Sequence, residues 1–251
     1  MSIYIIGDTH NCIDIAKLSL RNFPESRKFT EKDYVVICGD FGFPLLSSDV
    51  LPESIKSPDR DVRSGRKTYL YWMKWLSQKP YTILFVDGNH DNPRYWNSLP
   101  SEQWCGGLVH RSLDAPNVIH LQRGEYYTIA GKTFWTFGGA ELQEPAYYYQ
   151  QYNHWQQVLP SKEECVNGIK NLGKHDCCVD YIITHTMPTS LIAKMGFDPS
   201  FHDTVSDYLE IIHQHTKYQH WFCGHFHTDQ QDAESRLSIV YQTPLKIETF
   251  R

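Results

Sequence analysis

The feature that most constrains the fold is a series of five short apolar segments, each followed at once by Gly, Asp or His. They are four to six residues long and rich in Ile, Val, Tyr and Phe. This composition is typical of strands that are buried on both faces. Helical spacing of apolar residues between several of them favours an alternating α/β fold. The predicted strands are 2–6, 34–38, 81–86, 180–184 and 220–223.

The segments between these strands carry their own signals. One predicted helix opens with Ser161 and Glu164, which have the spacing of a capping box. Two other stretches, 118–138 and 237–248, have the short β-rich runs and turn residues of antiparallel strands. The predicted helices cover 13–22, 67–77, 161–172 and 203–217.

The length of 251 residues and an apolar content of 41% suffice for one substantial core. We therefore expect a single domain over 1–251. Two stretches, 44–66 and 140–160, are interpreted as insertions into it. The first is polar and suits a surface loop, whereas the second is aromatic and either packs as a loop or covers the site as a lid.

Charge and cysteine content limit the partners and the compartment. No run of 18 apolar residues occurs, so no membrane-spanning helix is expected. Seven cysteines without a Cys-x-x-Cys pair indicate free thiols in a reducing cytoplasm. A net charge of -5 argues against a nucleic-acid footprint over the whole surface, so nucleic acid is a possible but not a favoured partner. Nothing in the sequence indicates the oligomeric state.

Side chains of the kind that bind metals follow the predicted strands. Ligands of an open α/β sheet bind where the strands end at their carboxyl edges, so these side chains should converge on one crevice. Because residues i and i+2 of an extended segment share a face, both ends of each Asp-x-His or His-x-His pair should reach the metals. Oxygen and imidazole donors suit Mn, Fe, Zn, Ni or Mg more than a structural zinc site. The predicted ligands are Asp8, His10, Asp40, Asn89, His185, His225 and His227.

In these motifs the chain resembles the calcineurin-like metallophosphoesterase family. The resemblance implies a four-layer αββα sandwich built on mixed sheets, with two divalent ions, manganese first among them, at the strand edge. It also implies that Asp8, His10 and His227 hold one ion, that Asn89, His185 and His225 hold the other, and that Asp40 bridges. The blocks that carry the resemblance are Gly7-Asp8-Thr9-His10, Gly39-Asp40, Gly88-Asn89-His90-Asp91, His185 and Gly224-His225-Phe226-His227.

The expected reaction is hydrolysis of a phosphomonoester or phosphodiester by a hydroxide that bridges the two metals. His90 is the candidate for protonating the leaving group or stabilising its charge. Asp91 is the candidate for orienting the His90 ring through its other nitrogen. Arg94 is a candidate contact for a substrate phosphate, and otherwise a solvated residue at the start of a helix.

The chain departs from the pattern of the family, or of one of its branches, at three positions. Asn11 stands where the family often has glycine, and Phe43 stands where purple acid phosphatases carry a tyrosine ligand. Asp91 differs from the glutamate of the Ser/Thr protein phosphatases, which weakens the interpretation of the chain as a protein phosphatase.

Two alternative functions remain open. A nuclease-type phosphodiesterase would need a basic groove. A non-catalytic scaffold or binding module with this fold would be expected to have lost ligand positions.

Overall fold

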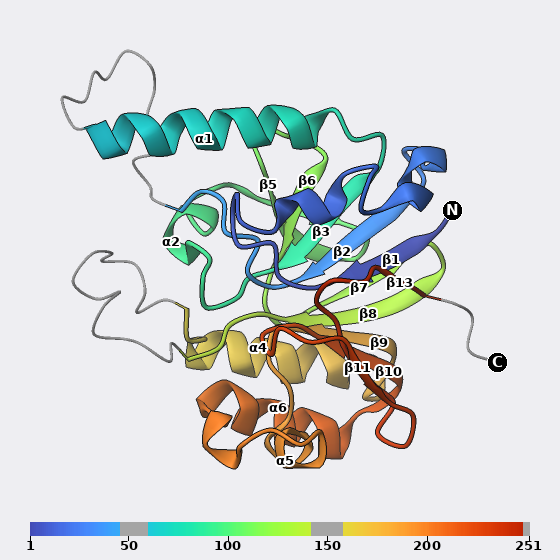
Figure 1. Cartoon of the computed structure of the whole chain (residues 1–251). Helices are drawn as coiled ribbons and strands as arrows, with labels where there is room; N and C mark the ends of the chain where they lie inside the picture. The colour runs from blue at the N-terminus through green and yellow to red at the C-terminus, as the bar shows by residue number, and fades with distance from the viewer. Residues whose placement is uncertain (46–59, 142–157, 248–251) are drawn as a thin grey trace.

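The computed structural model describes residues 1–45, 60–141 and 158–247, and it has the four-layer αββα architecture implied by the resemblance (Figure 1). Two mixed sheets pack face to face. One long helix covers the outer face of the first sheet, and three helices cover the outer face of the second (Figure 1). None of the helices in these ranges is long and apolar enough to cross a membrane.

The first sheet has seven strands in the order β13-β1-β2-β3-β6-β5-β4. Its centre is parallel and its margins are antiparallel, as the apolar runs of the central strands require. The strands are β1 (Ile3–Ile6), β2 (Tyr34–Cys38), β3 (Thr82–Val86), β4 (Ser101–Trp104), β5 (Gly107–Arg111), β6 (Val118–Leu121) and β13 (Leu245–Lys246).

The second sheet has six strands in the order β11-β12-β10-β9-β8-β7. The four central strands are parallel, and β7 and β11 are antiparallel to their neighbours. The strands are β7 (Glu125–Ile129), β8 (Lys132–Phe137), β9 (Cys178–Thr184), β10 (Lys217–Cys223), β11 (Gln230–Asp232) and β12 (Leu237–Ile239).

Alternation along the strands builds the layers, because successive side chains of a strand point to opposite faces. Ile37 and Phe85 share an outer core with Met73 of the long helix. Their neighbour Val36 faces the other way and shares the core between the sheets with Ile183 of β9. The five predicted strands are confirmed: their carboxyl ends coincide with the prediction, and their amino ends differ by at most three residues.

The helices are α1 (Arg60–Ser77), α2 (Pro93–Trp96), α4 (Lys162–Gly173), α5 (Thr189–Lys194) and α6 (Thr204–His215), with 3₁₀ turns at Ile15–Leu18, Pro24–Lys28 and Pro199–Phe201. The predicted capping box is confirmed, since the Glu164 amide donates to Ser161 Oγ and the Ser161 amide donates to the Glu164 carboxylate. Helix α1 begins inside the predicted insertion 44–66. The remainder of that insertion, 46–59, and 142–157 of the other lie outside the described residues.

The helix predicted over 13–22 is wrong. Only one 3₁₀ turn forms there, and Ser19 ends it in an extended conformation with φ -75 and ψ 152. The side chains of Asp14 and Lys17 bond to groups just before this segment, to the His10 ring and to the Asp8 carbonyl. Such side-chain bonds compete with regular helix.

The two stretches predicted as antiparallel pairs are only partly right. Within 118–138, β7 and β8 form the expected hairpin, but β6 lies in the other sheet. Within 237–248, β12 pairs with β10 of the second sheet, whereas β13 pairs with β1 of the first. Local pattern identifies a strand but not its partner. The segment between β12 and β13 therefore crosses from one sheet to the other.

Candidate metal centre

The candidate site lies where the parallel strands of both sheets end. From the first sheet, β1 leads into Asp8, β2 into Asp40, and β3 into Asn89. From the second sheet, β9 leads directly into His185 and β10 into His225. The sandwich therefore brings together donors that the sequence separates, as the rule for carboxyl edges predicts.

Four side chains form the outer half of the centre: Asp8, His10, Asp40 and His227. Each offers one donor atom, and these atoms all lie within 4.8 Å of one another. His10 Nε2 is 3.3 Å from Asp40 Oδ2, and His227 Nε2 is 3.2 Å from Asp8 Oδ2. Zinc-type ions bind nitrogen and oxygen at about 2.0–2.2 Å, so a cluster of this size fits one ion.

The inner half consists of Asp40, Asn89, His185 and His225. His185 Nε2 lies 2.8 Å from Asn89 Oδ1, 3.2 Å from His225 Nδ1 and 3.4 Å from Asp40 Oδ2. The same Asp40 oxygen therefore faces both halves. The structure brings all seven predicted ligands to these two adjoining clusters.

Hydrogen bonds fix which ring nitrogen faces each cluster. His185 Nδ1 donates to the Cys38 carbonyl at 2.8 Å, and His10 Nδ1 donates to Asp14 Oδ2 at 2.9 Å. In both rings the Nε2 lone pair therefore remains to bind a cation. Partners of this kind orient metal ligands and raise their basicity.

The electrostatics of the cluster also suit cations. Burial acts to lower the pKa of His185, but Asp40 and Asp8 raise it to about 10. Burial acts to raise the pKa of Asp40, yet His185 and His10 hold it well below its usual range. The field that retains protons on the rings would equally favour a divalent ion. The donor set therefore fits metal binding on chemical as well as geometric grounds.

The backbone of the candidate ligands is unusual. His10, Asp40, His225 and His227 have positive φ angles of 42, 50, 67 and 48. Such left-handed residues are uncommon outside glycine and cluster at functional sites. The prediction that Asp8-x-His10 and His225-x-His227 are extended is thus wrong: both ends of each pair reach the cluster, but turns, and not the pleat of a strand, aim the side chains.

The comparison with known proteins now places the chain. Its sequence matches the calcineurin-like phosphoesterase family over residues 1–229. The chain belongs to that family. This confirms the resemblance drawn from the motifs.

Three similar proteins accompany the family match. The lariat debranching enzyme of Schizosaccharomyces pombe is 24% identical over 264 residues, covering 95% of this chain and 52% of the relative. The chain thus spans about half the length of that protein. A putative 5′-nucleotidase from Staphylococcus aureus aligns with a TM-score of 0.47 at 12% identity, covering 96% of this chain and 48% of that one. The phosphopantetheinyl hydrolase of Mycobacterium tuberculosis aligns with a TM-score of 0.43 at 12% identity, covering 96% and 90%.

His90 lies beside the candidate metal cluster. Its backbone amide donates to Asp40 Oδ1 at 2.7 Å, and its ring meets the His10 ring edge-on, with centroids 5.6 Å apart. Burial lowers its pKa from the usual range. Arg94 is exposed on α2, and its contact with a substrate phosphate stays a prediction.

Asp91 has a different set of partners from the one predicted. Its carboxylate accepts the amides of Phe41 at 3.2 Å, Gly42 at 2.6 Å and Gly88 at 2.7 Å. Burial, together with the nearby Asp40 charge, raises its pKa to about 7. These bonds tie the loop after β2 to the turn after β3. Its role in orienting the His90 ring stays a prediction.

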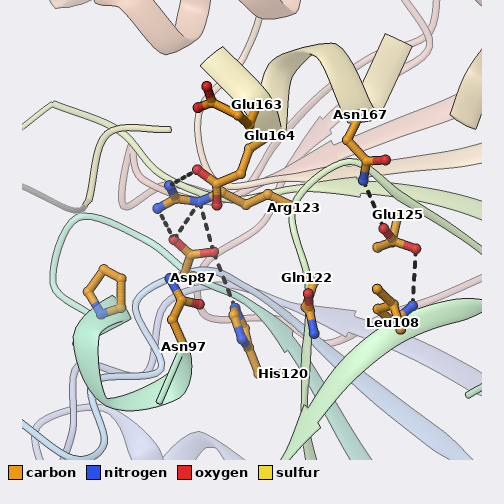
Figure 2. Close-up of a pocket in the computed structure, with 11 residues that line it drawn as sticks. Asp87, Asn97, Leu108, His120, Gln122, Arg123, Glu125, Glu163, Glu164 and Asn167 are labelled. Carbon is orange, nitrogen blue, oxygen red and sulfur yellow. Dashed lines mark hydrogen bonds and ion pairs between the residues drawn. The ribbon is translucent and has the colours of Figure 1, made fainter. Parts of the chain in front are cut away.

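A buried ion pair behind the Asn89 turn was missed by sequence reasoning. Arg123 pairs with Asp87, with Nε 3.0 Å from Oδ2, and also donates to the Val158 carbonyl at 2.8 Å. His120 Nε2 meets Asp87 Oδ1 at 3.3 Å, and Glu164 of α4 lies 3.5 Å from Arg123 (Figure 2). These groups line a cavity of about 240 Å³ and join the β3 turn to the second sheet. No local pattern identifies Arg123, although Asp87 stands directly before Gly88.

Proposed function

We propose that the chain is a dinuclear metal-dependent hydrolase of phosphomonoesters or phosphodiesters. One observation carries the proposal: Asp40 Oδ2 lies 3.3 Å from His10 Nε2 and 3.4 Å from His185 Nε2. Two divalent cations close together repel strongly and need a shared anion. A carboxylate oxygen between two sets of donors meets that requirement.

The residues divide as the family resemblance implies. Asp8, His10 and His227 would hold the outer ion, and Asn89, His185 and His225 would hold the inner one. When bound, divalent ions activate water at neutral pH and neutralise charge on the phosphoryl oxygens. Manganese is the first expectation, with Fe, Zn, Ni or Mg as alternatives, because all donors are oxygen or imidazole.

His90 would deliver a proton to the leaving oxygen or stabilise its charge. The hydrogen bond from the His90 backbone amide to Asp40 fixes the residue relative to the shared carboxylate. The His90 ring lies beside that of His10, a candidate outer ligand. A positioned general acid typically contributes ~10²–10⁴-fold. Asp91 would support this geometry by holding the two loops together, since its carboxylate accepts three of their amides.

The substrate class has two branches. The net charge of -5 favours a phosphorylated small molecule, while similarity to a protein named for lariat debranching keeps a nuclease-type phosphodiesterase as the alternative. A non-catalytic scaffold is less favoured, because no candidate ligand is lost. A cytoplasmic location is part of the proposal, since all seven cysteines are free thiols.

The test compares p-nitrophenyl phosphate with bis-p-nitrophenyl phosphate, using protein stripped by a chelator and then reloaded with Mn²⁺. We expect no turnover after stripping and recovery after loading, with the ratio of the two rates separating the branches. Metal-loaded protein that hydrolyses neither ester, nor any other phosphate ester offered, would contradict the enzyme assignment and favour the scaffold.

A further inference from the structure

The most exposed candidate ligand is stacked on an aromatic ring. The His227 side chain is 50% exposed, whereas that of Asp8, its neighbour in the outer half, is fully buried. The Tyr241 ring lies almost parallel to the His227 ring, with centroids 4.9 Å apart and planes at 17°. Stacking of this kind restricts a side chain that solvent would otherwise leave free to rotate.

Tyr241 also contacts the groups that support the other outer donors. Its hydroxyl donates to Asp14 Oδ2 at 3.3 Å, and the same oxygen accepts His10 Nδ1 at 2.9 Å. Lys17 Nζ lies 3.6 Å from the Tyr241 ring centroid and donates to the Asp8 carbonyl at 2.7 Å. One side chain therefore touches His227 directly, His10 through a carboxylate and Asp8 through an ammonium group.

The backbone that carries Tyr241 is held at the strand edge. It belongs to the segment that crosses from β12 to β13, and the Asp229 carboxylate accepts the amides of Tyr241 and the next two residues at 2.6–3.2 Å. The segment passes so close to Gly7 that a Cβ there would lie 2.0 Å from the Val240 carbonyl oxygen. A side chain at Gly7 would displace the segment and with it the Tyr241 ring.

We propose that Tyr241 is a positioning residue that preorganises the outer half for its divalent cation. The inference rests on the proposed metal-dependent function. Tyr241 lies beyond residue 229, where the match to the family ends. Supporting residues around a metal typically change its affinity by ~10–100-fold.

The experiment measures Mn²⁺ binding to the full chain by titration, following free Mn²⁺ by electron paramagnetic resonance. Wild type should bind two ions. Tyr241→Ala should weaken one of them ~10–100-fold and leave the other unchanged. Tyr241→Phe keeps the stacked ring and loses only the hydroxyl, so its affinity should lie between those of wild type and the Ala variant.

Tyr126 offers a matched control at the amino ends of β9 and β10. Its ring stacks on His175 with centroids 3.7 Å apart and planes at 7°, and its hydroxyl donates to the Cys178 carbonyl at 3.0 Å. Tyr126→Ala removes the same kind of contact and should leave both Mn²⁺ affinities at their wild-type values.

The outcomes separate this inference from the proposed function. Wild type that binds no Mn²⁺ would contradict the proposed function itself. Wild type with two ions and Tyr241→Ala with the same two affinities would contradict only the role of Tyr241. Equal weakening of both ions in Tyr241→Ala, with a lower melting temperature, would assign a general structural role and also overturn the inference.

Discussion

The two halves of the candidate metal centre are built differently. In the inner half, His185 is fully buried and its ring is oriented by the backbone carbonyl of Cys38. In the outer half, His227 is half exposed, and the supports are side chains, Asp14 and Tyr241. A backbone support is fixed once the sheets form, whereas side-chain supports must be ordered one by one.

From this difference we expect the two halves to differ in how tightly they bind their ions and how slowly they exchange them. The inner half is preformed by the core, so its ion should bind first and exchange slowly. The outer half faces solvent, so its ion should exchange more readily and lie nearer to an approaching phosphate. The following predictions test this contrast, from the largest expected effect to the smallest.

Asp40→Asn should remove the contrast by damaging both halves at once. The variant keeps the shape of the side chain but loses the shared negative charge, so both ions should weaken. We expect turnover to fall by more than the ~10–100-fold that is typical when a residue supporting a metal ligand is replaced. Metal analysis after dialysis, with ester hydrolysis, checks this. Retention of two tightly bound ions would rule out a bridging carboxylate.

His90→Ala should leave both halves intact and remove chemistry alone. We expect two bound ions and a turnover lowered by ~10²–10⁴-fold, because the leaving oxygen loses its proton donor. Metal content and kcat measured on the same sample provide the test. A sample that has lost its metal would show that His90 serves binding, not proton transfer.

Arg123→Met should lower the free energy of unfolding by breaking the buried ion pair behind the inner half. Burial acts to raise the pKa of Asp87, but Arg123 and His120 hold it well below its usual range, so the variant leaves the buried Asp87 carboxylate without its arginine partner. Breaking a buried pair in this way costs about 3–5 kcal/mol of unfolding free energy. Chemical denaturation measures it. Arg111→Met, which breaks an exposed pair with Glu102, should cost only ~0–1 kcal/mol. Similar losses in the two variants would contradict a special role for Arg123.

Asp14→Ala should weaken only the outer half. His10 would lose the acceptor that fixes its tautomer, so the affinity of one ion should fall ~10–100-fold while the other is retained. Asp14→Asn, which keeps an acceptor oxygen without the charge, should have a smaller effect. Stepwise Mn²⁺ titration distinguishes the two ions. Loss of the inner ion instead would reverse the proposed order of the halves.

Much of the frame was predictable because its signals are local. A run such as Tyr34–Cys38 is identified as a strand by its own residues, and the capping box at Ser161 specifies a helix start within one turn. The helix predicted over 13–22 does not form, because Asp14 and Lys17 bond back to His10 and to the Asp8 carbonyl at the candidate site. The prediction that the strands within 237–248 pair with each other was wrong, because strand pairing depends on how the two sheets pack together.

The sequence alone specified the carboxyl ends of the strands, the seven candidate donor side chains and the family, because residue type and spacing can be recognised without a fold. Only the tertiary structure decided which half of the candidate centre is buried and which side chains support each ring. His10 and His227 meet across 217 positions, and Tyr241 reaches Asp14 across 227. Contacts over such separations arise from packing two sheets together, and no local pattern specifies them.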